Sequence, residues 1–213
     1  MIVTATTVGA FAENAYLVVD EASGEAVYID PGDEGERLLD ALRKSGARLT
    51  AIWLTHAHID HIGGIAAIRR EIDVPIYLHP LDQPLYERGD EVAALYGLSF
   101  DAPPEVDLEL ADDDRLRLGT TTFTVAHVPG HAPGHVAFIG DNRVFGGDLL
   151  FAGSVGRTDL PFCNPEDMAA SLARAATWES SLLVHPGHGP STTIGHEVAT
   201  NGFLQGAARP IRR

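Results

Sequence analysis

The amino-acid sequence predicts an α+β protein in which two β-sheets pack together and helices cover their outer faces. Two observations lead to this prediction. Strand-like segments followed by a helical segment fill the first half of the chain, and the same succession recurs in the second half. Several strands also end at turns that carry histidine or aspartate. Strands and helices that are apolar on one side reach a stable arrangement by stacking in layers.

In the first half, strands are expected where β-branched and aromatic residues dominate, at 3–8, 15–19, 26–29, 51–54 and 76–78. A helix should begin after Asp33, a suitable N-cap with Glu36 three residues later, and should end at Gly46. A second helix is expected between residues 62 and 72. The proline-containing stretch 81–106 is predicted to be the least regular part of the chain.

In the second half, a meander of strands is expected at 115–118, 121–128, 136–139 and 144–145. Asn164 followed by Pro165 predicts the start of a helix. A last strand is expected at 182–184 and a last short helix at 193–200. Because no repeat or linker interrupts this order, residues 1–213 are predicted to form one domain.

Composition excludes several classes of partner. A formal net charge of −15 disfavours a nucleic-acid substrate, whose phosphates require a basic surface. No apolar stretch approaches the roughly 18 residues of a membrane span. The N-terminus lacks the pattern of a signal peptide, so a cytoplasmic protein is expected.

Cys163 is the only cysteine, so any bound metal must be held by nitrogen and oxygen atoms. The sequence does not indicate an oligomeric state.

The run His56-Ala57-His58-Ile59-Asp60-His61 is the most informative segment, because four potential metal ligands follow an apolar strand. Side chains alternate in an extended segment, so His56 and His58 can face the same ion. Asp60 and His61 come next, where two glycines indicate a turn into a helix, and they are placed to face a second ion. Apolar packing does not require this cluster. The run therefore predicts a metal site.

Three further candidate ligands lie where loops leave strand ends, the usual position of site residues on a rigid scaffold. They are His131, Asp148 and His188. Two divalent ions close together repel each other, and a bridging carboxylate with a bridging hydroxide offsets that repulsion. The predicted grouping is therefore one ion on His56, His58 and His131, a second on Asp60, His61 and His188, and Asp148 between them.

The other histidines are expected to be surface or hydrogen-bonded residues: His79, His127, His135, His185 and His196. His127 and His135 lie four residues to either side of His131 and are candidates for orienting it. His188 is preferred to His185 as a ligand because the glycines on both sides of His188 favour an exposed turn.

With these residues the chain resembles the metallo-β-lactamase superfamily, whose His-x-His-x-Asp-His signature appears at 56–61. His131, Asp148 and His188 follow in the family's order, and the resemblance covers nearly the whole chain. It implies a four-layer αβ/βα sandwich and seven metal ligands. It also implies two divalent metal ions, with zinc as the first choice and iron or a mixed centre as alternatives.

Within that superfamily the chain is most similar to the glyoxalase II-like hydrolases, the hydroxyacylglutathione hydrolases and their shorter relatives. The segments that carry this likeness are 14–18, 28–32, 151–159 and 187–195. The resemblance implies hydrolysis of a small-molecule thioester by a metal-bridging hydroxide that Asp60 and Asp148 orient. The chain ends soon after His188, without room for the C-terminal helical region of full-length members, so a short form is expected.

Two positions depart from that group, which offers a Lys and a Tyr to glutathione in the loop after Asp148. Here Arg157 and Asp159 occupy those places. Arg157 is the candidate substrate-binding residue because it can meet a carboxylate, whereas Asp159 would repel one. The alternative is an ion pair between them that organises the loop. Recognition of glutathione stays open.

Three other functions remain possible from the residues. A persulfide dioxygenase is a related branch with one iron held by two His and one Asp, and the chain resembles it at 156–159, with Cys163 nearby. A lactonase or other ester hydrolase would use the same dinuclear centre. A non-enzymatic module would keep the fold alone, although seven intact metal positions argue against that.

Overall fold

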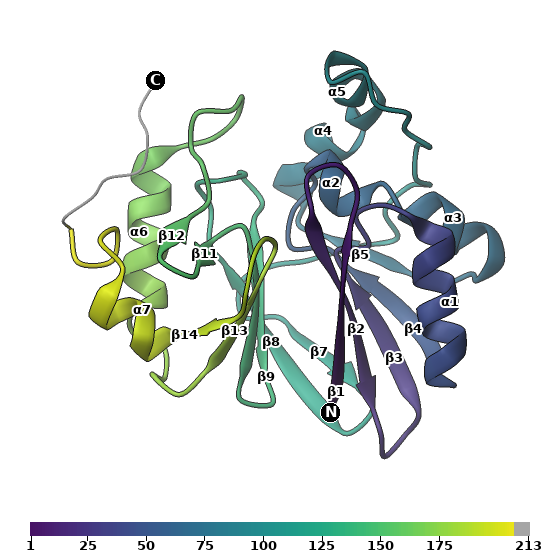
Figure 1. Cartoon of the computed structure of the whole chain (residues 1–213), viewed down its shortest axis with the longest axis horizontal. Coiled ribbons are helices and arrows are strands. Elements are labelled where there is room, and N and C mark those ends of the chain that lie inside the picture. Colours follow the sequence, from purple (N-terminus) through teal and green to yellow (C-terminus); the bar gives the residue numbers. More distant parts are fainter. Residues whose placement is uncertain (207–213) are drawn as a thin grey trace.

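The computed structural model describes residues 1–206 and contains two six-stranded sheets that face each other (Figure 1). The first sheet has the order β1 (Ile2–Val8), β2 (Glu13–Asp20), β3 (Glu25–Ile29), β4 (Arg48–Trp53), β5 (Ile76–Leu78) and β6 (Leu108–Glu109). The second has the order β14 (Thr192–Thr193), β13 (Leu183–Pro186), β10 (Arg143–Gly147), β9 (Val136–Gly140), β8 (Thr121–His127) and β7 (Arg115–Leu118). Residues 207–213 lie outside the described part, so the prediction of one domain over 1–213 remains a prediction.

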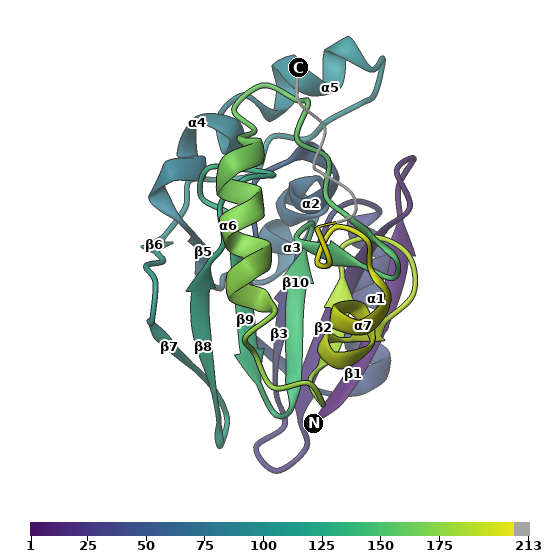
Figure 2. The same ribbon diagram turned by 90° about the vertical axis from the view of Figure 1, so that its left-hand side faces the viewer.

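Helices cover the outer face of each sheet, which confirms the predicted fold class. Figure 1 shows α1 (Gly35–Ser45) and α3 (Ile65–Glu71) beside the first sheet, and α6 (Pro165–Ala175) and α7 (Ile194–Thr200) on the opposite side. In the perpendicular view, α6 and α7 lie in front of the strands of the second sheet (Figure 2). No helix within residues 1–206 is long and apolar enough to cross a membrane.

Alternating side chains explain why the layers form. All eight residues of β2 are buried, because one face of this strand meets the second sheet and the other meets the helices. Tyr16 and Val18 join the cluster between the sheets, whereas Leu17 packs in the cluster beneath α1 and α3. Large aromatic side chains fill the space between the sheets: Trp53, Phe123, Phe138 and Phe145. Burying each such side chain contributes about 1.5–3 kcal/mol.

The strand directions bring the candidate loops to one edge of the sandwich. Both β8 and β10 run antiparallel to β9, and β13 runs parallel to β10. The carboxyl ends of β8, β10 and β13 therefore point the same way, and the loops after them carry His131, Asp148 and His188. In the first sheet β4 is parallel to β3 and β5, and it ends just before His56.

The first helix begins later than the sequence predicted. Its N-cap is Glu34 rather than Asp33, and α1 starts at Gly35. The backbone of Glu34 adopts a left-handed conformation with φ 49, and the carboxylate of Asp33 accepts a hydrogen bond from Glu34 N at 2.6 Å. Asp33 thus closes the loop before the helix instead of capping the helix.

The second predicted helix is two helices, α2 (Ile59–Ile62) and α3, separated by Gly63 and Gly64. The loop after β3 crosses at this point, and a Cβ on Gly64 would lie 2.8 Å from Pro31 O. The prediction that Asp60 precedes a helix was therefore wrong, because helix α2 already starts at Ile59.

The stretch 81–106 is more regular than predicted. It contains the end of the short helix η1 (Pro80–Asp82), then α4 (Gln83–Tyr86) and α5 (Gly89–Leu95). These helices lie above the same edge of the first sheet as α2 (Figure 1). Their short length and their prolines hid them from a search for helical periodicity.

Candidate metal centre

The predicted ligands lie in two groups at the shared edge of the two sheets. One group holds His56, His58 and His131, and the other holds Asp60, His61 and His188. Within each group the potential ligand atoms lie within 4.8 Å of one another. Side chains that are far apart in the sequence thus come together as the spacing predicted. Their role as metal ligands is a proposal that we take up below.

The first group forms because the chain stays extended after β4. His58 has an extended backbone (φ −68, ψ 151) and serves as N-cap of α2. The His56 and His58 rings meet edge to face with their centroids 4.8 Å apart. His131 arrives from the loop after β8, and its Nε2 lies 2.8 Å from His58 Nδ1. Three ring nitrogens from two elements therefore face one point.

The second group is carried by the single turn of α2 and by the loop after β13. His188 Nε2 lies 3.3 Å from Asp60 Oδ2, and His61 Nε2 lies 3.9 Å from the same oxygen. Because Asp60 and His61 are helical neighbours, the side chain of His188 is needed to complete the group. His188 thereby connects the two sheets at this edge.

Asp148 lies between the two groups. Its Oδ2 is 3.4 Å from His131 Nε2 and 3.5 Å from His188 Nε2, and its Oδ1 is 3.5 Å from His61 Nε2. Gly187 makes this approach possible, because a Cβ there would lie 2.2 Å from Asp148 Oδ1. The carboxylate thus reaches nitrogen atoms of both groups, as a bridging ligand would.

Buried atoms without partners show that the centre fits divalent cations. His56 Nε2, His61 Nε2 and Asp148 Oδ1 are buried and have no hydrogen-bond partner. Burying a polar atom without a partner is costly, so three such atoms at one place indicate a ligand that the protein atoms do not supply. Imidazole and carboxylate donors suit zinc or iron in particular.

Asp30, which the sequence analysis did not single out as a site residue, fixes two of these rings. Its Oδ2 accepts a hydrogen bond from Thr55 Oγ1 at 2.6 Å and one from His61 Nδ1 at 3.1 Å. Thr55 Oγ1 in turn accepts from His56 Nδ1 at 3.0 Å. In the neutral form of each ring the proton then sits on Nδ1, which leaves the lone pair of Nε2 for a metal. The signal available in the sequence was an aspartate at the end of a buried strand.

Hydrogen bonds to groups that are not candidate ligands also hold His131 and Asp148. The carbonyl of Arg157 accepts a hydrogen bond from His131 Nδ1 at 2.8 Å, so Nε2 is the nitrogen of His131 that faces the first group. His135 Nε2 accepts from Asp148 N at 3.0 Å. The sequence analysis proposed His135 as a partner of His131, and its recorded hydrogen bond is to Asp148 instead.

Asp82 joins the two loops that carry the first group, a role the sequence did not reveal. Its carboxylate accepts hydrogen bonds from Ala57 N at 3.0 Å and from Gly134 N at 2.5 Å. Burial raises the pKa of Asp82 to about 6, although these two bonds pull it down. Asp82 comes from the short helix η1 within a stretch that gave no chemical signal in sequence.

Glu13 is a second buried carboxyl that sequence reasoning missed. Both of its oxygens are buried without a hydrogen-bond partner, and Oε1 lies 3.9 Å from His61 Nδ1. Burial raises the pKa of Glu13 well above its ordinary value, more than the neighbouring His61 lowers it. Glu13 thus contributes a carboxyl group behind the second group of ligands, close to the ring that Asp30 holds.

Electrostatics differ between the two groups. Burial, together with the neighbouring imidazoles, lowers the pKa of His56 and of His58 well below the ordinary value. Burial also lowers the pKa of His61, but Asp60, Asp30 and Asp148 outweigh it and raise that pKa overall. The first group is therefore neutral and ready to coordinate, whereas a cation in the second group displaces a proton.

An open cavity of about 330 Å³ lies over both groups. His58, Asp60, Asp148 and His188 form its polar floor, and Phe11, Tyr96, Phe151 and Leu160 belong to its apolar wall. Arg157 also lines it, paired with Asp159 through Nε–Oδ1 at 2.6 Å and Nη2–Oδ2 at 2.8 Å. The ion pair that sequence reasoning considered is formed.

The remaining histidines lie outside both ligand groups. The rings of His79 and His127 stack with their centroids 4.2 Å apart, and His196 is exposed. His185 belongs to β13 and stacks on Phe145 with a centroid distance of 4.9 Å. The structure therefore brings His188, not His185, to the predicted second group.

The chain is similar to several known proteins over nearly its whole length. The chain is 48% identical to the protein in the crystal structure of TTHA1623 in a di-iron-bound form, over 94% of this chain and 100% of that one, with a TM-score of 0.87. It is 35% identical to hydroxyacylglutathione hydrolase GloC of Haemophilus influenzae, over 92% of this chain and 95% of that protein. It is 28% identical to ETHE1 from Myxococcus xanthus, over 97% and 85% of the two chains, with a TM-score of 0.80.

The likeness extends over nearly all of the described fold. The model of the metallo-beta-lactamase superfamily matches residues 8–188, a span that reaches from the end of β1 to the last predicted ligand, His188. The family and fold that the sequence motifs implied are thus confirmed, and the chain belongs to the metallo-beta-lactamase superfamily, whose members are generally metal-dependent hydrolases.

Proposed function

We propose that this protein is a dinuclear metallohydrolase that cleaves small-molecule thioesters. One observation carries the proposal: Asp148 lies 3.4–3.5 Å from nitrogen atoms of both ligand groups. A carboxylate in this position offsets the repulsion between two dications. The similarity to hydroxyacylglutathione hydrolase GloC supports a thioester as the substrate.

Each residue has a distinct task in this proposal. His56, His58 and His131 would hold one divalent ion, and Asp60, His61 and His188 the other, with zinc, iron or a mixture of the two as the metal. Two bound cations would supply the chemistry by lowering the pKa of a bound water towards about 7 and by polarising the substrate carbonyl. Asp30, His135 and the carbonyl of Arg157 keep the ligand side chains in position.

Asp60 and Asp148 would orient the attacking water. Burial raises the pKa of Asp60, but His61 and His188 outweigh this and keep it below its usual range. Asp60 therefore stays ionised and can accept a hydrogen bond from the water. A departing thiolate, with an ordinary pKa near 8.5, leaves without a general acid. Hydrolysis of a thioester therefore does not require a general acid in the site, whereas hydrolysis of an amide does.

The test combines metal analysis of the purified protein with assays on a thioester, a lactone and a persulfide. Two metals per chain and thioester hydrolysis would support the proposal. One iron per chain with sulfite formation would instead favour the persulfide dioxygenase. Lactone cleavage without thioester cleavage would favour the ester hydrolase, and metal-free protein without activity would favour the non-enzymatic module.

A further inference from the structure

We propose, on the basis of the thioesterase function above, that the preferred substrate is a thioester of an apolar acyl group on an uncharged thiol. In this proposal Asp159 acts as a specificity-determining residue. Its carboxylate pairs with the guanidinium group of Arg157, which could otherwise bind an anionic thiol such as glutathione. The cavity lining and the ion pair lead to this inference independently.

The cavity wall is suited to a hydrocarbon chain. Phe11, from the turn after β1, and Tyr96, from the end of α5, meet edge to face with ring centroids 5.3 Å apart. Both line the cavity and both are exposed, at 39% and 53%. Val92, Phe151 and Leu160 extend this apolar lining. Large apolar side chains that stay open to solvent beside a polar floor are a common feature of ligand sites.

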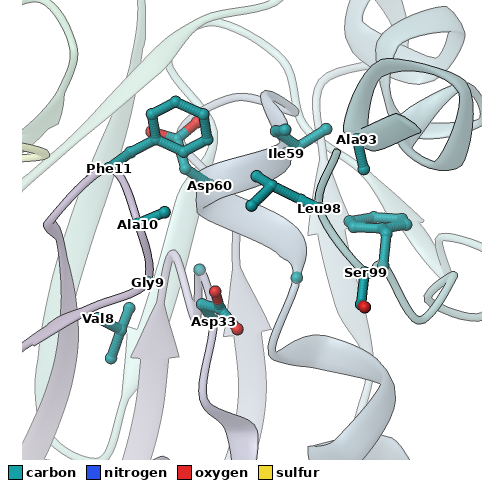
Figure 3. Close-up of a pocket in the computed structure, with 13 residues that line it drawn as sticks. Val8, Gly9, Ala10, Phe11, Asp33, Ile59, Asp60, Ala93, Leu98 and Ser99 are labelled. Carbon is teal, nitrogen blue, oxygen red and sulfur yellow. The ribbon is translucent and has the colours of Figure 1, made fainter. Parts of the chain in front are cut away.

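A second hollow of about 60 Å³ adjoins the cavity, and its lining mixes apolar residues with Asp33, Asp60 and Ser99. It shares Phe11, Ile59 and Asp60 with the main cavity. Figure 3 shows the side chains of Phe11, Ile59 and Leu98 gathered at one end of this hollow, while Asp33 and Ser99 lie at the other. An acyl chain whose carbonyl lies near Asp60 would therefore meet the apolar side chains of Phe11 and Ile59, which line both hollows.

The charge around the cavity disfavours an anionic thiol. Among the residues that the structure describes, Arg157 is the only Lys or Arg that lines the cavity. Its guanidinium group meets Asp159 through two hydrogen bonds, at 2.6 and 2.8 Å, which occupy one edge of the fork that a substrate carboxylate would use. A glutathione thioester carries two carboxylates, and Asp159 already occupies the edge of the guanidinium group that one of them could use.

The first experiment compares four thioesters with the metal-loaded enzyme. The hexanoyl and lactoyl groups are each attached to glutathione and to N-acetylcysteamine, a neutral thiol. We expect kcat/KM to be highest for hexanoyl-N-acetylcysteamine and lowest for lactoylglutathione, with about a tenfold effect of the acyl chain. Equal or higher kcat/KM for the glutathione thioesters would overturn the inference.

Substitution of Asp159 tests the ion pair directly. In Asp159→Asn the guanidinium group of Arg157 becomes available, so the ratio of kcat/KM for glutathione over N-acetylcysteamine thioesters should rise about three- to fivefold. Asp40→Asn is the matched control, because Asp40 forms an exposed ion pair with Arg43 on α1 and its loss removes the same charge. An unchanged ratio in Asp159→Asn, or the same rise in Asp40→Asn, would refute the role of Asp159.

Substitution of Tyr96 tests the apolar wall. Tyr96→Ala should reduce kcat/KM for the hexanoyl thioester several times more than for the lactoyl thioester of the same thiol, mainly through KM. An equal loss on both acyl groups would contradict the assignment. The four-substrate comparison also separates the two proposals: if no thioester is cleaved by protein that holds two metals, the proposed function fails, whereas preferred cleavage of lactoylglutathione overturns only the substrate class.

Discussion

At the scale of single residues, the candidate centre depends on atoms that are not ligands themselves. Asp30 holds the ring of His61 directly and that of His56 through Thr55, and the carbonyl of Arg157 holds His131. Sequence motifs predicted the candidate ligands because four of them fall within the six residues 56–61. The same motifs could not identify Asp30, because a single aspartate in a turn has many ordinary explanations.

Asp148→Ala should abolish binding of the second metal and most of the turnover. Removing this carboxylate leaves His61 Nε2 and His188 Nε2 without the anion that faces both groups. We expect one metal per chain instead of two and a drop in kcat/KM of more than about a hundredfold. Elemental analysis together with thioester assays checks this. Full activity with two metals bound would refute the bridging role.

Asp82→Ala should weaken metal binding although Asp82 contacts no ligand side chain. The change leaves the buried Ala57 N and Gly134 N without their acceptor, at a cost of about 1–3 kcal/mol each. Both loops of the first ligand group then lose their connection, and metal affinity should fall about 10–100-fold. Competition with a chromophoric chelator measures the affinity. Asp82→Asn keeps one acceptor oxygen and should show a smaller loss, so equal losses in the two variants would contradict this account.

His185→Phe should reduce the sensitivity of the protein to mild acid. Burial, and then the charge of Arg143, lowers the pKa of His185 to about 4, whereas the unfolded value is near 6.5. Between these values only the unfolded chain binds the proton, so stability is complete above about pH 6.5 and is lost as the pH falls towards 4. Phenylalanine keeps the stacking on Phe145 but has no proton to bind.

Urea denaturation at pH 7, 6 and 5 checks this expectation. The free energy of unfolding of His185→Phe minus that of the wild type should increase by at most about 1.4 kcal/mol for each pH unit below 6.5. A constant difference between the two proteins across this range would show that His185 does not contribute to the acid sensitivity.

At the scale of elements, features set by local signals were predictable, whereas features set by contacts between distant segments were not. The longer strands and the N-cap of α6 belong to the first kind, and Asn164 accepts hydrogen bonds from Glu166 N and Asp167 N. The starts of α1 and α3 depend on tertiary contacts instead. Glu34 receives a hydrogen bond from Gly9 N, and Gly64 lies against Pro31. Contacts between distant segments leave no periodic signal in the sequence.

Two adjacent glycines at the end of β10, Gly146 and Gly147, test how closely distant segments pack there, because substitution by alanine should affect them differently. In Gly147→Ala the new Cβ would lie 2.3 Å from Thr55 Oγ1, on backbone with φ 47, so Thr55 and its bond to Asp30 must shift. We expect a loss of about 1–3 kcal/mol in stability and weaker metal binding. In Gly146→Ala the nearest atom is 3.7 Å away, and stability should change little.

Thermal denaturation and metal titration of the two glycine variants provide the measurement. If both variants lose similar stability, the contact with Thr55 is not the reason that Gly147 is required. Normal metal binding in Gly147→Ala would show that the link from Thr55 to the histidine rings is dispensable.

At the scale of the whole molecule, the candidate centre joins the two sheets. His56, His58, Asp60 and His61 follow the first sheet, and His131, Asp148 and His188 follow the second. The element order predicted two sheets with outer helices, and strand directions explain why the ligand loops meet. The sequence alone could not show that β13 pairs with β10 in parallel, because that pairing brings together segments about 40 residues apart.

Removal of the metals should therefore lower the stability of the whole fold and not only the activity. Ligands that bind the folded state at 1,000 times their dissociation constant stabilise it by about 4 kcal/mol. We expect a clear fall in Tm when a strong chelator is added, and recovery on addition of zinc. Scanning calorimetry before and after chelation measures it, and an unchanged Tm would mean that the two sheets do not depend on the centre.

The hydrogen bond between His131 and the carbonyl of Arg157 has a practical implication for engineering. The same loop positions an imidazole and presents the Arg157–Asp159 pair to the cavity. Libraries that randomise this loop to broaden the accepted thiols should therefore yield many clones that lose metal along with selectivity. Diversifying Phe11 and Tyr96, which belong to other segments, offers a route to new acyl preferences that leaves the loop intact.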